Sequence, residues 1–116
     1  MRPLRPLPHS SFEILLTLAA GPAHGYGIKR SVEERTDGAV RLGAGTLYTA
    51  LQRLETNGHI REVPGEPSQQ DDSASVRWRF YELTDSGLEL VRAEVRRLER
   101  ALGFAHSLPA LRGEAV

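Results

Sequence analysis

The stretch Gly43-Ala44-Gly45-Thr46-Leu47-Tyr48-Thr49-Ala50-Leu51-Gln52-Arg53-Leu54-Glu55 predicts an amphipathic helix whose outer face lacks the usual solvating charges. At about 100° per residue, its three leucines fall on one narrow stripe with Ala50 beside it, and this stripe is expected to be buried. The opposite face carries small, hydroxyl, amide and cationic groups: Gly45, Thr46, Thr49, Gln52, Arg53 and Thr56. We expect this face to lie against another molecule.

Glycines mark both ends of the predicted helix. At its start, Gly43 and Gly45 allow close approach of another backbone and leave free N–H groups at the positive pole, where a phosphate is favoured. At its end, Asn57-Gly58 supplies residue types that tolerate the left-handed conformation of a helix exit. The sequence therefore predicts a short helix with an anion-binding start.

The composition is that of a single domain whose 116 residues form only a modest core, so a partner subunit would add stability. The absence of cysteine excludes disulfides and thiolate metal sites, and the scattered histidines indicate no metal or cofactor. The net charge of zero argues mildly against nucleic acid, although all but one of the 15 basic residues are arginine, which suits phosphates and guanine edges. With no long apolar run and no signal-peptide core, a cytoplasmic protein without membrane contact is expected.

Two further helices are predicted before this stretch. Residues 1–9 hold three prolines and two arginines and form either a mobile tail or a basic arm that touches a groove. A helix over 10–20, with Ser10 and Glu13 at capping-box spacing, is apolar around nearly its whole circumference. One of its faces is expected to pack internally and another to meet a second subunit, with Phe12, Leu15 and Leu16 as the candidate dimerisation residues.

The segment 24–35 predicts a short helix with Ile28 and Val32 inward and Lys29 outward. His24 is expected to pack or to hydrogen-bond at the start of this helix. A short connection containing glycine leads from it to the first quoted stretch, so the two helices form a candidate helix-turn-helix.

After Gly58 the apolar period changes from 3.6 to 2, which predicts antiparallel strands over 60–63 and 76–83. Two strands directly after such a helix make a wing, and the polar, acidic segment 64–75 is expected to be a disordered tip. Arg77 and Arg79 share one strand face and either contact a nucleic-acid backbone or form a solvated surface. Trp78 is expected to be a packing residue.

The last predicted helix begins after Thr84, which is expected to cap it, and ends at Gly103. Its apolar residues step by three and four along one seam: Leu88, Val91, Val95, Leu98 and Leu102. The seam is too short for a freestanding coiled coil. It is expected to pack against the first helix of a twin chain, and the alternative is a helix that lies on its own domain.

Three segments resemble signature segments of the PadR family of bacterial transcriptional regulators. They are His24-Gly25-Tyr26-Gly27-Ile28, the stretch 45–55 followed by Gly58-His59-Ile60, and Arg79-Phe80-Tyr81-Glu82-Leu83-Thr84-Asp85-Ser86-Gly87. The resemblance covers residues 10–102 in the family's order. It implies a homodimer that binds a palindromic operator, usually as a repressor, and releases it when an effector binds or a signal arrives. It also assigns the last helix to the dimerisation surface.

The sequence departs from the family's pattern in three places. Thr49 stands where members commonly have proline, and this leaves the helix intact. The wing tip is longer and more acidic than usual, which argues against its contact with DNA. The last helix has no tryptophan, and Phe104 is the only aromatic residue near its end, so an aromatic-binding pocket known in compact relatives is not carried over.

The predicted fold class is therefore mainly α with a small antiparallel β wing, a winged helix-turn-helix with a C-terminal dimerisation helix. The predicted parts are an arm over 1–9, a DNA-binding domain over 10–83, a dimerisation helix over 84–103 and a tail over 104–116. The predicted DNA-binding residues are Lys29, Ala44, Gly45, Thr46, Tyr48, Thr49, Arg53, Arg77 and Arg79.

The predicted function is a sequence-specific DNA-binding transcriptional regulator, with double-stranded DNA, a second copy and a possible small-molecule effector as partners. The alternative is a winged-helix dimer that binds a protein or small molecule without DNA. An enzyme is not expected, since no catalytic residues, nucleophile motif or metal-ligand spacing is present.

Overall fold

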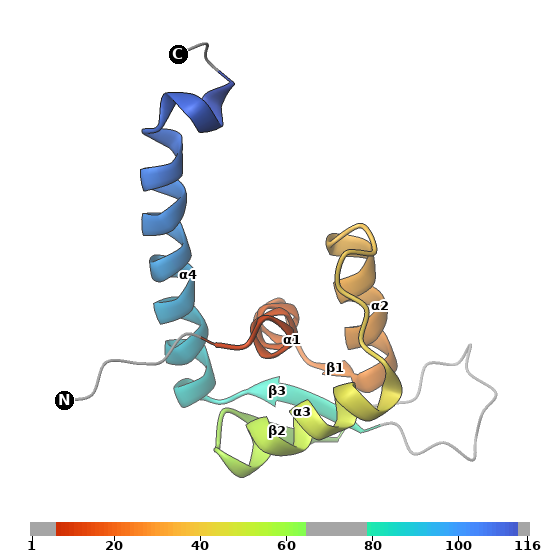
Figure 1. The fold of residues 1–116 in the computed structure, drawn as a ribbon. Coiled ribbons are helices and arrows are strands. Elements are labelled where there is room, and N and C mark those ends of the chain that lie inside the picture. The colour runs from red at the N-terminus through yellow and green to blue at the C-terminus, as the bar shows by residue number, and fades with distance from the viewer. Residues whose placement is uncertain (1–6, 65–78, 114–116) are drawn as a thin grey trace.

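The structure is a computed structural model that describes residues 7–64 and 79–113 (Figure 1). Its elements in chain order are α1 (His9–Ala19), β1 (Ala23–His24), α2 (Gly25–Arg35), α3 (Ala44–Thr56), β2 (Ile60–Val63), β3 (Phe80–Leu83), α4 (Asp85–His106) and the 3-10 helix η1 (Pro109–Arg112). The predictions for the arm over 1–6, most of the wing tip, Arg77 and Trp78 lie outside the described residues. None of the helices in the described ranges is long and apolar enough to cross a membrane.

Helix α1 is the centre of the fold, and it packs against α2, α3, α4 and β3. Its apolar circumference is therefore covered largely by its own chain. The buried core draws residues from all four long helices and from two strands: Phe12, Ile14, Leu15, Leu18, Ile28, Val32, Leu42, Leu47, Ala50, Leu51, Leu54, Ile60, Tyr81 and Val91.

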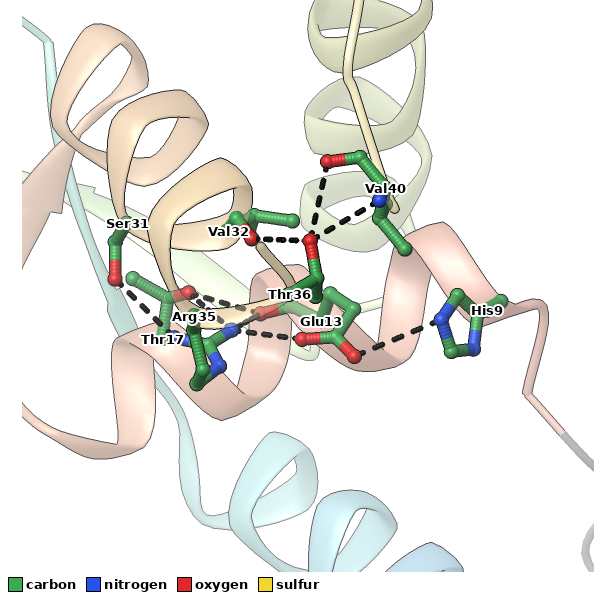
Figure 2. Close-up of polar contacts among 8 residues, drawn as sticks. All are labelled: His9, Glu13, Thr17, Ser31, Val32, Arg35, Thr36 and Val40. Atoms are coloured by element: carbon green, nitrogen blue, oxygen red, sulfur yellow. Dashed lines mark hydrogen bonds and ion pairs between the residues drawn. The ribbon is translucent and has the colours of Figure 1, made fainter. Parts of the chain in front are cut away.

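The predicted capping box at the start of α1 is wrong. The helix begins one residue earlier, with Pro8 at the N-cap and without a side-chain cap. The carboxylate of Glu13 instead accepts a hydrogen bond from the Arg35 guanidinium on α2 at 2.8 Å, and Arg35 also donates to the Thr17 hydroxyl at 3.0 Å (Figure 2). A strong charged partner from another helix outweighs the weaker local cap. Glu13 thus ties α1 to α2.

The helix-turn-helix forms as predicted. Ile28 and Val32 on α2 are fully buried. The turn after α2 is tied together by Thr36, whose hydroxyl donates to the Val32 carbonyl at 2.8 Å and accepts from the Val40 N–H at 3.0 Å (Figure 2). Helix α3 ends at Thr56 with Asn57 as its C-cap, and Gly58 follows in the left-handed region with φ 81°. This exit turns the chain directly into β2.

The sheet has three antiparallel strands in the order β1-β3-β2, one more than the sequence predicted. Ile60 pairs with Leu83 and Val63 with Phe80, so β2 and β3 form the two-stranded wing. The unpredicted strand β1 adds Ala23 opposite Tyr81. Two residues are too few to show a period of 2, so the sequence carries no signal for β1.

Helix α4 begins as predicted, with the Thr84 hydroxyl accepting from the Gly87 N–H at 3.1 Å. It does not end at Gly103, as the sequence predicted, but continues to His106 and has Ser107 as its C-cap. Gly103 is not among the residues with positive φ, so it does not adopt the exit conformation that a terminating glycine needs. Pro109, which disfavours helical geometry in the residue before it, lies close to the actual end. In Figure 1, α4 rises away from the rest of the fold as an extended arm.

Candidate nucleic-acid interface

Helix α3 buries its apolar stripe and exposes the opposite face, as the sequence predicted. Leu47, Leu51 and Leu54 are at most 4% exposed and lie in the core. The residues predicted to lie outward, and Ala44 before them, are all exposed: Ala44, Gly45, Thr46, Thr49, Gln52, Arg53 and Thr56. We call these residues together with Tyr48 the reading face. It carries hydroxyl, amide and guanidinium groups that suit base edges and phosphates.

The start of α3 is open. Gly43 is the N-cap and has no side chain that could cap the helix, and its carbonyl accepts from the Leu47 N–H at 2.9 Å. The first-turn N–H groups of an α-helix have no partner within the helix, so those of Ala44, Gly45 and Thr46 point outward at the positive pole. A Cβ on Gly45 would meet no described atom within 4 Å. This end is therefore sterically free to approach a phosphate.

Tyr48 is held between the two helices of the motif. Its side chain is 53% exposed, while its hydroxyl end covers Gly25 at the start of α2. A Cβ on Gly25 would lie 3.0 Å from the Tyr48 hydroxyl oxygen and 3.4 Å from two ring carbons. The absence of a side chain at position 25 thus lets the Tyr48 ring lie close to α2. Tyr48 therefore packs against α2 while about half of its surface stays exposed, and its contact with the DNA backbone stays a prediction.

His24 caps α2, as predicted. Its Nδ1 accepts from the Gly27 N–H at 3.0 Å, which fixes the first turn. The ring meets Phe80 of β3 edge-on at 5.2 Å between centroids and stacks on Tyr26 at 6.4 Å. Because His24 also belongs to β1, this contact joins the sheet to the helix-turn-helix.

The structure places the remaining predicted cations around this motif. Lys29 is partly exposed on α2, and Arg79 is exposed just before β3. Burial raises the pKa of Tyr81 above its usual value, and the nearby Arg79 guanidinium opposes this rise. Arg79 therefore lies at the wing next to Tyr81 and is exposed there.

Gln52 is not among the DNA-binding residues predicted from the sequence, although the helical wheel places it on the outer face. Gln52 is exposed one helical turn after Thr49 and next to Arg53. A glutamine amide is suited to adenine edges in the major groove. Its position on the helical wheel is the signal that identifies it.

The predicted dimerisation residues fall into two groups. Phe12, Leu15 and Val91 are buried in the core of their own chain, and Leu16 and Leu88 are partly buried against it. Val95, Leu98 and Leu102 are 36%, 39% and 55% exposed on the part of α4 that extends from the domain. We call these three residues the exposed seam. The first half of α4 therefore lies on its own domain and the second half exposes its apolar residues. Packing of the seam against a twin chain stays a prediction.

Residues 14–93 match the family model of the transcriptional regulator PadR-like family. The chain belongs to this family. Membership in the PadR-like family confirms the predicted class of function, a DNA-binding transcriptional regulator, and the winged helix-turn-helix fold is confirmed with it.

Solved structures of PadR-like and related regulators share this fold. A transcriptional regulator from Clostridium thermocellum is 26% identical with a TM-score of 0.68, and the match covers 86% of this chain and 89% of that one. A PadR family regulator from Clostridium difficile is 23% identical with a TM-score of 0.69 over 86% and 97% of the two chains. Bacillus subtilis PadR in complex with operator DNA is 23% identical with a TM-score of 0.61 over 75% and 46%.

One curated relative is closer in sequence. An uncharacterized 37.1 kDa protein in transposon TN4556 of Streptomyces fradiae is 36% identical over 98 residues, which is 83% of this chain. The chain spans 25% of that protein's length.

Proposed function

We propose that two copies of this PadR-like chain bind a palindromic operator, with the reading face of α3 from each copy in the major groove. One observation carries the proposal: α3 buries its leucine stripe completely and exposes a face of hydroxyl, amide and guanidinium groups. A helix-turn-helix places the N-terminal part of its second helix against base edges. The operator complex solved for Bacillus subtilis PadR, which has the same fold, supports this arrangement.

The roles follow from position along α3. Thr46, Thr49 and Arg53 face outward at successive turns and would contact base edges, together with Gln52. The open N-terminus of α3 and the Tyr48 hydroxyl would contact the adjacent phosphates. Lys29 and Arg79 would add backbone contacts beside the reading face.

We propose that the exposed seam of α4 forms the dimer contact. Three apolar side chains on one side of a helix that leaves its own domain would be buried by the same residues of a second copy. Burial of such a patch stabilises the dimer by roughly 25 cal/mol for each Å² of apolar surface removed from water. In a symmetric dimer the two reading helices would lie about one DNA turn apart, roughly 34 Å.

The proposal includes repression of nearby genes in the cytoplasm and release of the operator when an effector binds. In this scheme the chain acts by occupying DNA and carries out no catalysis. Its zero net charge favours the alternative, a winged-helix dimer that binds a protein or small molecule. Salt dependence separates the two, because binding to phosphates weakens steeply as salt is added.

The test is selection of bound sequences from a random DNA pool, followed by titration of the selected duplex at several salt concentrations. Arg53→Ala should weaken binding by at least about fivefold, the lower end of what one base contact contributes. Arg100→Ala is the matched control, since Arg100 is equally an exposed arginine but lies on α4. Selection of an inverted repeat supports the proposal. No enrichment of any sequence, or equal effects of the two substitutions, would overturn it.

A further inference from the structure

The exit of α3 and the start of α4 lie at the same end of the sheet (Figure 1). Ile60, the first residue of β2, pairs with Leu83, the last residue of β3. The chain reaches Ile60 from α3 and leaves Leu83 into α4. The antiparallel register therefore brings the end of the reading helix next to the beginning of the helix that carries the exposed seam.

Hydrogen bonds join these two ends. The Thr84 hydroxyl donates to the Gly58 carbonyl at 2.6 Å and accepts from the Gly87 N–H at 3.1 Å. The Thr84 N–H donates to the His59 carbonyl at 3.1 Å. A single residue thus holds the first turn of α4 and the turn after α3 together.

Gly87 brings the two backbones into direct contact. A Cβ at this position would lie 1.9 Å from the His59 carbonyl oxygen and 2.9 Å from its carbonyl carbon, a distance that no real side chain tolerates. His59 is itself anchored to α3, because its N–H donates to the Leu54 carbonyl at 2.9 Å. Its ring Nδ1 lies 2.9 Å from the Ser86 Oγ on α4. We call Gly58, His59, Thr84, Ser86 and Gly87 the α3–α4 clamp.

The clamp fixes the angle between α3 and α4. If the exposed seam joins two copies, this angle determines both the distance and the rotation between the two reading faces. We propose that Gly87 and Thr84 are positioning residues that set the spacing between operator half-sites, although neither contacts a base. The inference rests on the proposed function, because it assumes a dimer that binds an inverted repeat.

The clamp can be tested with a series of DNA duplexes. Each duplex carries two inverted copies of the half-site obtained by selection, the spacer between the copies is one base pair longer in each successive duplex, and the affinity of the protein for each duplex is measured. Each base pair changes the separation by about 3.4 Å and the rotation by about 34°, so the wild-type protein should prefer one spacer by roughly tenfold over its neighbours. Gly87→Ala should reduce this preference to about twofold or move the optimum. Dimerisation, measured by light scattering, should not change.

Gly103→Ala is the matched control, because a Cβ at Gly103 on the same helix would meet no described atom within 4 Å. It should keep the wild-type spacer profile. Should Gly87→Ala fail to fold, Thr84→Val decides the question, since valine keeps the shape and removes the hydroxyl that bonds both ends. Thr84→Ser retains the hydroxyl and should restore the wild-type profile.

The two proposals fail in different ways. A wild-type protein that enriches no DNA sequence overturns the proposed function and this inference with it. A wild-type protein with a sharp spacer preference that Gly87→Ala, or Thr84→Val in its place, leaves unchanged overturns only the clamp.

Discussion

Replacing Arg35 with alanine should destabilise the protein by about 2 kcal/mol, because it leaves a buried carboxylate without its main partner. Glu13 has a side chain only 10% exposed, and the Arg35 guanidinium donates to its carboxylate at 2.8 Å and to its carbonyl at 3.1 Å. The same guanidinium donates to Thr17 at 3.0 Å and to Ser31 at 3.1 Å (Figure 2). Arg35 therefore connects α1 to α2 through three contacts, and its bond to Ser31 lies within α2.

The magnitude follows from the burial of the two partners. Removing one member of a fully buried ion pair costs roughly 3–5 kcal/mol. The Arg35 side chain is 35% exposed, so water can reach the space that the substitution vacates, and the cost is reduced to about 2 kcal/mol. In a domain of this size that loss corresponds to a decrease in Tm of about 10 °C.

Urea unfolding followed by far-ultraviolet circular dichroism, at one fixed protein concentration, measures the loss. Arg30→Ala is the matched control on the same helix, since Arg30 and Glu34 form an exposed pair that contributes at most about 1 kcal/mol. The double variant Glu13→Ala with Arg35→Ala should cost at least about 1 kcal/mol less than the sum of the two single substitutions. Strict additivity, or an equal loss in Arg30→Ala, would refute the reasoning.

Three further predictions concern other parts of the molecule. Leu98→Glu should convert the proposed dimer to a monomer in size-exclusion chromatography with light scattering, and an unchanged dimer would exclude the exposed seam as the interface. Gly25→Ala should displace the Tyr48 hydroxyl and weaken operator binding about fivefold, the value of one hydrogen bond, with little change in Tm, whereas wild-type affinity would show that this placement is irrelevant. The hydrogen bond from Arg97 lowers the pKa of Glu94 below its usual 4.5 in the folded protein. The stability that Glu94 contributes is therefore complete above about pH 4.5 and is lost as the pH falls through the lower pKa of the folded state. Urea midpoints from about pH 6 to pH 3 should therefore fall less steeply in Glu94→Gln than in the wild type.

The elements that the sequence predicts well are those whose signal is local and periodic. The leucine stripe of α3 has a period near 3.6, and the change to a period of 2 after Gly58 locates β2 at its observed bounds. Thr84 is an N-cap residue type directly before an apolar periodic segment, and it caps α4 as expected. In each case neighbours in sequence supply the interaction that decides the structure.

The elements that it does not predict depend on contacts between distant residues. Glu13 is 22 residues from Arg35, so the local spacing from Ser10 indicates a capping box that the ion pair overrides. Gly87 looks like an ordinary helix residue until the wing register places His59 against it. Apolar residues around all of α1 indicate that the helix is buried, but they do not indicate which elements pack against it. In the structure, α2, α4 and β3 of the same chain make most of these contacts.

The position of α1 bears on how an effector could release the operator. Helix α1 packs against α2, α3 and α4, so the core connects the reading face to α4, and the α3–α4 clamp connects them a second time. Two rigid connections within one chain leave little freedom for α3 to move relative to the start of α4. A change in the separation of the reading faces must then arise where α4 leaves the core, at Val95 and beyond. We therefore expect an effector to act by changing how the two α4 helices cross, and its binding should alter the preferred operator spacer in the same assay that tests the clamp.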